Sequence, residues 1–202
     1  MNNGIIFDFD GVICDSVNVK TEAFKLMYSQ YGKEVVEKVE EYHNEHGGIS
    51  RYEKFRHFHK EFLGIELNDD DIFRMAEVFS SIVLQKVIDS NYIPGVIKFI
   101  KSRYKNTDLF ICTGTPETEI LEILERKKIK KYFKGIYGSP KSKVEIINLI
   151  INNFKITSRQ LEFYGDAMTD YKAANITKVK FIGVLNKTTS FPLETTVIKN
   201  FL

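Results

Sequence analysis

The chain has 202 residues, 43% of them hydrophobic and 28% charged, a composition typical of a globular protein with a substantial core. Its 29 Lys and Arg residues nearly balance 27 Asp and Glu residues, which argues against nucleic-acid binding. No apolar run reaches the roughly 18 residues of a membrane span, and no basic segment precedes the first apolar stretch. Two cysteines are too few for the disulfide framework of a small secreted protein. We therefore expect a cytoplasmic protein that binds neither membranes nor nucleic acid.

The first predicted element is a buried strand over residues 5–9, a short apolar run that carries Asp8 and Asp10 between two glycines. Residues 15–91 predict helices only. Within that segment, Ser50-Arg51-Tyr52-Glu53 has the capping-box pattern, and three phenylalanines follow it at helical spacing. The segment is therefore predicted to be an all-helical unit.

Beyond Pro94-Gly95, helices and strands alternate. Strands are predicted over residues 109–112, 135–137, 161–164 and 179–185, and helices over residues 96–100, 116–128, 143–153 and 169–175. This alternation indicates parallel βαβ units, and hence an α/β fold with a doubly wound, Rossmann-like parallel sheet. We predict a catalytic core over residues 1–14 and 92–202, interrupted by a helical domain over residues 15–91.

Two pairs of carboxylates follow predicted strands. Asp8 and Asp10 are two residues apart and are expected to project from the carboxyl end of the first strand. Asp166 and Asp170 come just after the strand over residues 161–164. The carboxyl ends of parallel strands meet at one sheet edge, where ligands of open α/β sheets bind. Oxygen ligands of this kind suit Mg²⁺, so a magnesium site is predicted at that edge.

Groups suited to binding an anion are expected at the same edge. Thr113 follows the strand over residues 109–112, and Lys141 or Lys143 follows the strand near Tyr137. We favour Lys143, because Ser142 is a predicted N-cap that would place Lys143 at the start of a helix. Lys141 remains the alternative.

Together these motifs resemble those of the haloacid dehalogenase superfamily. The match consists of Asp8-Phe9-Asp10-Gly11-Val12, Thr113 after an apolar strand, a lysine at 141 or 143, and Gly165-Asp166-Ala167-Met168-Thr169-Asp170. The resemblance spans the whole predicted core in the family's order. It implies a Rossmann-like core carrying a helical C1-type cap.

The resemblance also implies roles for these residues. Asp8 would be the nucleophile and Asp10 the general acid and base. Mg²⁺ would be held by the Asp8 carboxylate, the Asp10 backbone carbonyl and Asp166, with Asp170 supporting the metal shell. Thr113, the Gly114 amide and the lysine would hold the phosphoryl oxygens. Dehalogenases of the family lack the second aspartate, so Asp10 favours phosphoryl transfer.

The cap contains a segment that resembles the specificity loop of β-phosphoglucomutase-like members, Gly48-Ile49-Ser50-Arg51. By this resemblance Gly48, Ser50 and Arg51 are candidate specificity residues. Arg51 also shares a helical stripe with the three phenylalanines, so it is predicted to face the site and contact the part of the substrate remote from the phosphoryl group.

The predicted function is Mg²⁺-dependent hydrolysis of a small phosphorylated metabolite through an aspartyl-phosphate, with a sugar phosphate as the favoured substrate class. Two alternatives stay open. One is a mutase of the β-phosphoglucomutase type, which returns the phosphoryl group to a second hydroxyl. The other is a catalytically idle binding or regulatory protein on the same fold. The sequence makes no prediction about oligomeric state.

Overall fold

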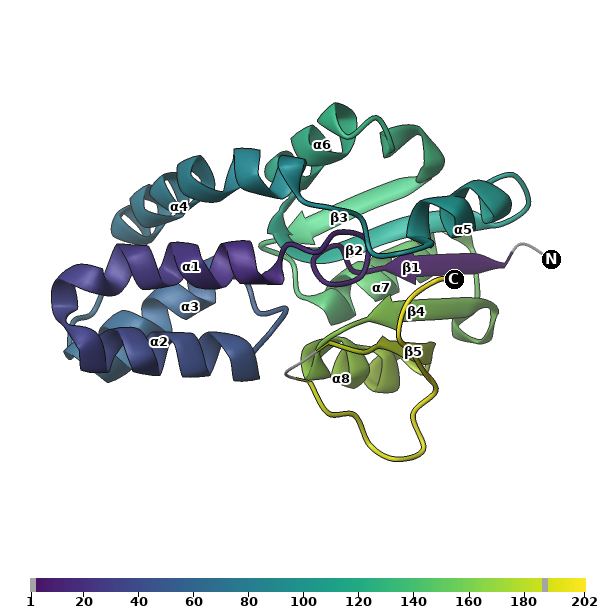
Figure 1. The fold of residues 1–202 in the computed structure, drawn as a ribbon. Coiled ribbons are helices and arrows are strands. Elements are labelled where there is room, and N and C mark those ends of the chain that lie inside the picture. The colour runs from purple at the N-terminus through teal and green to yellow at the C-terminus, as the bar shows by residue number, and fades with distance from the viewer. Residues whose placement is uncertain (1–2, 187–188) are drawn as a thin grey trace.

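The computed structural model describes residues 3–186 and 189–202 and contains a six-stranded parallel sheet in the order β3-β2-β1-β4-β5-β6 (Figure 1). The strands are β1 (Gly4–Phe7), β2 (Asp108–Pro116), β3 (Gly135–Ser139), β4 (Leu161–Gly165), β5 (Lys180–Val184) and β6 (Val197–Ile198). The chain moves outward from β1 through β2 to β3 and then returns to place β4 on the other side of β1. Such a reversal defines the switch point at which ligands of these sheets bind. The predicted α/β class with a doubly wound parallel sheet is confirmed.

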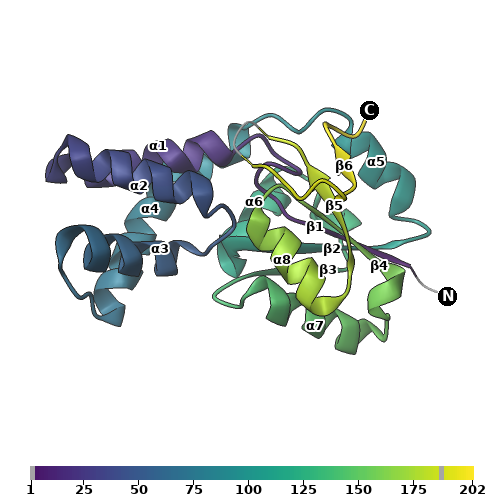
Figure 2. The same ribbon diagram turned by 90° about the horizontal axis from the view of Figure 1, so that it is seen from below.

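Helices cover both faces of the sheet (Figure 2). Helices α7 (Lys143–Phe154) and α8 (Met168–Thr177) pack on the face that carries Ile6, Phe110 and Phe163. Helices α5 (Val96–Arg103) and α6 (Glu117–Arg126) share the other hydrophobic cluster, which includes Ile5 and Phe7. Neighbouring strand residues point to opposite faces, so the apolar runs of the central strands are buried on both sides.

The segment between β1 and α5 is helical and extends away from the carboxyl edge of the sheet (Figure 1). It contains α1 (Val17–Tyr28), η1 (Ser29–Tyr31), α2 (Lys33–Glu45), α3 (Arg51–His57), η2 (Phe58–Leu63) and α4 (Asp69–Asp89). Ser50 is the N-cap residue of α3 as predicted, because its side chain accepts a hydrogen bond from the Glu53 amide. We call residues 15–91 the cap; the domain limits at its two ends stay predictions.

Some elements differ from the predicted ones. Strand β1 ends at Phe7 rather than Phe9, because the Phe9 carbonyl accepts the amides of Ile13 and Cys14 at 2.9 and 3.1 Å and closes a turn. The helix expected to run on through residue 62 changes from α to π geometry at Phe58. The short strand β6 was not predicted, and its two residues carry no periodic pattern. Two further 3₁₀ turns, η3 (Lys130–Tyr132) and η4 (Ser158–Gln160), precede β3 and β4.

Within the described residues, no helix combines the length and the apolar character that crossing a bilayer requires.

Candidate active site

Three buried carboxylates meet at the carboxyl ends of β1 and β4. Asp8 follows β1, and its amide donates to the Tyr164 carbonyl of β4 at 2.9 Å. Asp166 follows β4, and Asp170 lies in the first turn of α8. One oxygen from each of Asp8, Asp166 and Asp170 lies within 4.8 Å of the others. The sheet topology therefore brings together three of the four aspartates that the sequence singles out.

Lys143 provides the positive charge beside this carboxylate cluster. Ser142 and Glu145 form a capping box at the start of α7, which makes Lys143 its first helical residue. The Lys143 Nζ atom donates to Asp8 Oδ2 at 2.7 Å and also to Asp170. The alternative, Lys141, instead lies 3.7 Å from Glu117, and its side chain is 44% exposed. The structure thus brings Lys143, and not Lys141, to the candidate nucleophile.

The carboxylate cluster has the chemistry of a divalent-cation site. Burial, followed by the charges of Asp8 and Asp170, raises the pKa of Asp166 well above its usual value. Burial also raises the pKa of Asp170, against the opposing effect of Lys143. Three carboxylates share one lysine, which leaves net negative charge in a buried space, and carboxylate oxygens are the ligands that Mg²⁺ prefers. The residues present therefore fit the predicted magnesium ion.

Asp10 lies outside the carboxylate cluster. Its carboxylate accepts hydrogen bonds from Ser16 at 2.6 Å and Thr115 at 3.1 Å, and it forms an ion pair with Lys20 of α1. Burial alone would raise the pKa of Asp10, but Lys20 and these hydroxyl groups lower it overall. The expected shared orientation of Asp8 and Asp10 on one strand is wrong, because β1 ends before both residues. The predicted metal contact of the Asp10 backbone carbonyl stays a prediction.

The cap loop closes over the end of β2. Thr113 and Gly114 line the pocket together with Gly47 and Gly48 of the cap. A Cβ atom at Gly114 would lie 2.7 Å from the Gly48 carbonyl oxygen, so the two backbones touch. The Thr169 hydroxyl donates to the Gly47 carbonyl at 2.5 Å. The structure therefore represents a closed arrangement in which the cap covers the candidate phosphoryl site.

Gly48→Ala is expected to lower kcat/KM for phosphate release by about tenfold or more, because small displacements of a closing loop misplace the substrate. Gly48 has a φ of +80°, and an added Cβ would lie 2.4 Å from Thr169 Oγ1 and 2.8 Å from Lys143 Nζ. The matched control is Gly64→Ala in the same cap. Gly64 has a φ of +68°, but nothing lies within 4 Å of an added Cβ. Steady-state kinetics should therefore separate a blocked closure from backbone strain alone, and equal activities of the two variants would contradict the closure role.

Of the candidate specificity residues of the cap, Gly48 and Arg51 line the pocket and Ser50 does not. Arg51 is the first residue of α3 and lines the pocket, but its guanidinium makes two hydrogen bonds of 2.8 and 2.7 Å to Glu119 of α6. It also donates to Ser80 of α4 at 2.6 Å. The Ser50 hydroxyl is occupied as a helix cap. The predicted substrate contact of Arg51 stays a prediction, and it would require the guanidinium to be shared with Glu119.

Several residues that line the pocket were not anticipated from the sequence, namely Lys20, Lys54 and Thr115. Glu119, the ion-pair partner of Arg51, was not anticipated either. Lys54 could have been found, because positions 51, 54, 55 and 58 form one helical stripe. The four cap histidines, His43, His46, His57 and His59, are predicted from the sequence to lie at the surface or to face the substrate. His43 does line the pocket, but His59 is buried, and its Nδ1 lies 2.8 Å from the Tyr28 hydroxyl. Its imidazole fills the cap interior rather than the pocket.

The sheet topology, the carboxylate cluster, Lys143 and the covering cap together are those expected of the haloacid dehalogenase superfamily. Sequence comparison gives the same result. The profile of the haloacid dehalogenase-like hydrolases matches residues 5–184, so the chain belongs to that family and is a hydrolase. A phosphorylated carbohydrates phosphatase from Thermotoga maritima is 27% identical over 178 residues, which are 84% of this chain and 79% of that protein. A phosphoglycolate phosphatase from Pseudomonas savastanoi is 24% identical over 189 residues, or 89% and 68% of the two chains.

Solved structures show the same fold. A β-phosphoglucomutase from Clostridium difficile superimposes with a TM-score of 0.80 at 21% identity, covering 100% of this chain and 92% of that one. A hydrolase from Pseudomonas syringae gives a TM-score of 0.78 at 17% identity, with coverages of 99% and 94%. At these identities the likeness concerns the arrangement of core and cap.

Proposed function

We propose that this protein is a Mg²⁺-dependent phosphatase that hydrolyses a small phosphorylated metabolite, with phosphorylated carbohydrates as the favoured substrate class. The observation that carries the proposal is the placement of Asp8. It is buried at the switch point of the sheet, with Lys143 at 2.7 Å and two further carboxylates beside it. A phosphoryl group brought to Asp8 would meet a nucleophile and the charges that offset its own.

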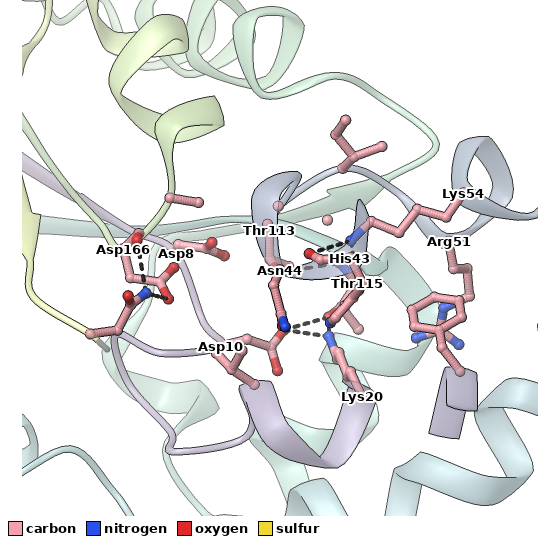
Figure 3. Close-up of a pocket in the computed structure, with 18 of the residues that line it drawn as sticks. Asp8, Asp10, Lys20, His43, Asn44, Arg51, Lys54, Thr113, Thr115 and Asp166 are labelled. Atoms are coloured by element: carbon pink, nitrogen blue, oxygen red, sulfur yellow. Dashed lines mark hydrogen bonds and ion pairs between the residues drawn. The ribbon is translucent and has the colours of Figure 1, made fainter. Parts of the chain in front are cut away.

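Asp8 is positioned to attack phosphorus. Its Oδ1 accepts the Phe9 amide at 2.6 Å, and its Oδ2 accepts Lys143. These contacts orient the carboxylate toward the pocket that the cap covers (Figure 3). When bound, Mg²⁺ would be held by the Asp8 carboxylate, Asp166 and the Asp10 backbone carbonyl, with Asp170 supporting them, and it would offset the negative charge of the phosphoryl oxygens. Lys143, Thr113 and the Gly114 amide would orient those oxygens.

Asp10 would move the protons. In the first half of the reaction an Asp8 oxygen bonds to phosphorus, the P–O bond to the substrate breaks, and protonated Asp10 donates its proton to the leaving oxygen. In the second half, water attacks the phosphorus of the aspartyl-phosphate, Asp10 takes a proton from that water, and the P–O bond to Asp8 breaks, which restores the Asp8 carboxylate and releases phosphate. The ion pair with Lys20 and the bond from Thr115 favour the ionised form that this second half needs.

The relatives support the substrate class. The Thermotoga maritima relative is named for phosphorylated carbohydrates, and the Pseudomonas savastanoi relative for phosphoglycolate. A panel of phosphorylated sugars and short phosphorylated acids, with released phosphate as the readout, tests the proposal. Hexose 1-phosphates in the panel test the mutase alternative, because a mutase would convert them to the 6-phosphate without releasing phosphate. Absence of turnover on the whole panel with Mg²⁺ present would overturn the proposal.

Chelation is expected to abolish phosphate release, and Mg²⁺ should restore it, because the carboxylate cluster would otherwise repel the substrate. Mg²⁺ should also raise the thermal midpoint of the wild-type protein, since a ligand that binds only the folded state stabilises it. Asp166→Asn should lose this shift. Full activity in excess chelator, or an unchanged midpoint with saturating Mg²⁺, would contradict the metal assignment.

A further inference from the structure

Lys54 is a buried cation in the wall of the candidate active site. It lies on α3 of the cap, it is 2% exposed, and it lines the same pocket as Asp8, Asp10 and Thr113. In Figure 3 its side chain runs from α3 into the pocket, and its amine ends at His43. The Lys54 Nζ atom lies 2.7 Å from His43 Nδ1 and 3.4 Å from the His43 carbonyl oxygen.

Lys54 differs from the neighbouring cations in its partners. Lys20 pairs with Asp10, Arg51 with Glu119, and Lys143 with Asp8 and Asp170. Among the ion pairs of residues 3–186 and 189–202, none involves Lys54. Its only hydrogen-bond acceptors in that part of the chain belong to His43. Lys54 is therefore the pocket cation whose charge no carboxylate of the described residues offsets.

The surroundings of Lys54 do not supply an anion from another element of the described chain. The His43 ring packs against Phe24 of α1, and burial followed by the charge of Lys54 lowers the pKa of His43 well below its usual value, so the ring is neutral. The charged groups that act on Lys54 across the pocket are Lys20 and Lys143, which repel it, and Asp10, which already has Lys20. A buried lysine without an anionic partner destabilises the fold, because its amine must either carry a desolvated charge or give up its proton, so its presence in a pocket points to a bound counter-ion.

We propose that Lys54 binds a second anionic group of the substrate, a carboxylate or a phosphate, on the leaving-group side of the P–O bond that is cleaved. This inference rests on the proposed phosphatase function. The transferred phosphoryl group would already be held by Lys143, Thr113 and the cation of the carboxylate cluster, all from the core. Lys54 comes from the cap, which covers the opposite side of the pocket. The preferred substrates then carry a second anionic group in addition to the transferred phosphoryl group, unlike sugar monophosphates, whose leaving group is uncharged.

Arg51 is less available for this anion. Its guanidinium already forms the bidentate ion pair with Glu119, and a substrate would have to compete with a buried carboxylate at 2.7 Å. Lys54 lies one turn further along the same helix and needs no such exchange, because His43 is neutral. An anion bound at Lys54 would supply an ion pair that the described residues do not provide, and it would break no existing one.

The experiment compares matched substrate pairs on the wild type and on Lys54→Met. The pairs are 2-phosphoglycolate with 2-hydroxyethyl phosphate, and glucose 1,6-bisphosphate with glucose 6-phosphate; p-nitrophenyl phosphate reports the core chemistry alone. The first compound of each pair carries a second anionic group and is called its anionic member. Wild type should prefer the anionic member of at least one pair. Lys54→Met should lower kcat/KM for that member by about tenfold or more, the effect of losing a charged hydrogen bond, and should lower it much less for p-nitrophenyl phosphate, which has no second anionic group.

Two further variants test whether charge is the cause. Lys54→Gln can still donate a hydrogen bond to His43 but carries no charge, so it should lose the preference as Lys54→Met does. Lys60→Met is the matched control, since Lys60 lies in the same cap with its side chain 65% exposed beside Glu66. Lys60→Met should behave as wild type. A Lys54→Gln variant that keeps the preference would overturn the role of the charge.

A binding experiment distinguishes failure of this proposal from failure of the proposed phosphatase function. Calorimetric titration of wild type and Lys54→Met with the preferred anionic compound, on an Asp8→Asn background, needs no turnover. Weaker binding to the Lys54→Met form supports the anion site even where no phosphate is released. Equal binding, or a wild type that prefers neither anionic member, overturns it. Equal losses on every substrate together with a lower thermal midpoint would instead make Lys54 a structural residue, which also overturns it.

Discussion

Asp8→Asn is expected to reduce phosphate release by about 10³-fold or more on every substrate, because an amide has nearly the same shape as the carboxylate but does not attack phosphorus. The fold should remain intact. The substituted side chain would keep an oxygen for the Phe9 amide, and Lys143 would retain Asp170 as its partner. Removing one of three clustered carboxylates also relieves repulsion, so the thermal midpoint should equal or exceed that of the wild type.

The matched control for this experiment is Asp15→Asn. Asp15 lies in the same loop, is exposed and does not belong to the carboxylate cluster. It should retain full turnover in the same released-phosphate assay. Near wild-type turnover by Asp8→Asn would show that another group attacks phosphorus, and it would remove the aspartyl-phosphate from the mechanism.

The core of the candidate site was predictable because two of its aspartates directly follow strands. Asp8 and Asp166 come after apolar runs whose β character is clear, and parallel strands bring their carboxyl ends to one edge. Lys143 was predictable for a local reason as well. Ser142 caps α7, and a cap fixes the first helical residue whatever the tertiary packing.

The cap contacts could not be predicted in the same way. The partner of Arg51, Glu119, is 68 residues away on α6, and its first-turn position looks like that of any solvated glutamate. Whether Lys20 meets Asp10 depends on how α1 leaves the sheet. Such pairs arise from the closure of the cap on the core, which no periodicity within one helix encodes. The stripe of Arg51 and the phenylalanines could have indicated that Lys54 is buried, but not that its amine lacks a carboxylate among the described residues.

Removing the charge of Lys54 should also change stability. Burial, with the charges of Lys20 and Lys143, lowers the pKa of Lys54 to about 7, so the unfolded chain binds more protons than the folded one between about pH 7 and the usual lysine value. Wild-type stability should therefore rise with pH over that range. Lys54→Met should be more stable than wild type at pH 7, by several degrees in thermal midpoint, and its own stability should rise less with pH. A less stable Lys54→Met at pH 7 would contradict this.

Arg51→Ala is expected to lower the free energy of unfolding by about 3–5 kcal/mol, because it leaves Glu119 buried without its counter-ion. The two side chains are 4% and 6% exposed, and they join α3 of the cap to α6 of the core. Burial raises the pKa of Glu119, but Arg51 and Ser80 lower it overall. The pair therefore stabilises the fold above the usual glutamate pKa, and its contribution is lost as the pH falls through the lowered value. Urea unfolding at pH 7 and at pH 4 should show a smaller penalty at the lower pH.

A double variant separates this stabilising role from the predicted substrate contact. Arg51→Met combined with Glu119→Leu removes both charges and keeps apolar volume, so its stability should return to within about 1–2 kcal/mol of the wild type. Any change in kcat/KM of this variant then reflects the loss of Arg51 as a substrate ligand rather than a loss of stability. If Arg51 acts only through Glu119, kcat/KM should be close to wild type on substrates with and without a second anionic group. A selective loss on the anionic member of a substrate pair would instead show that Arg51 shares the second anion with Lys54, and a double variant as unstable as Arg51→Ala would contradict the ion-pair account.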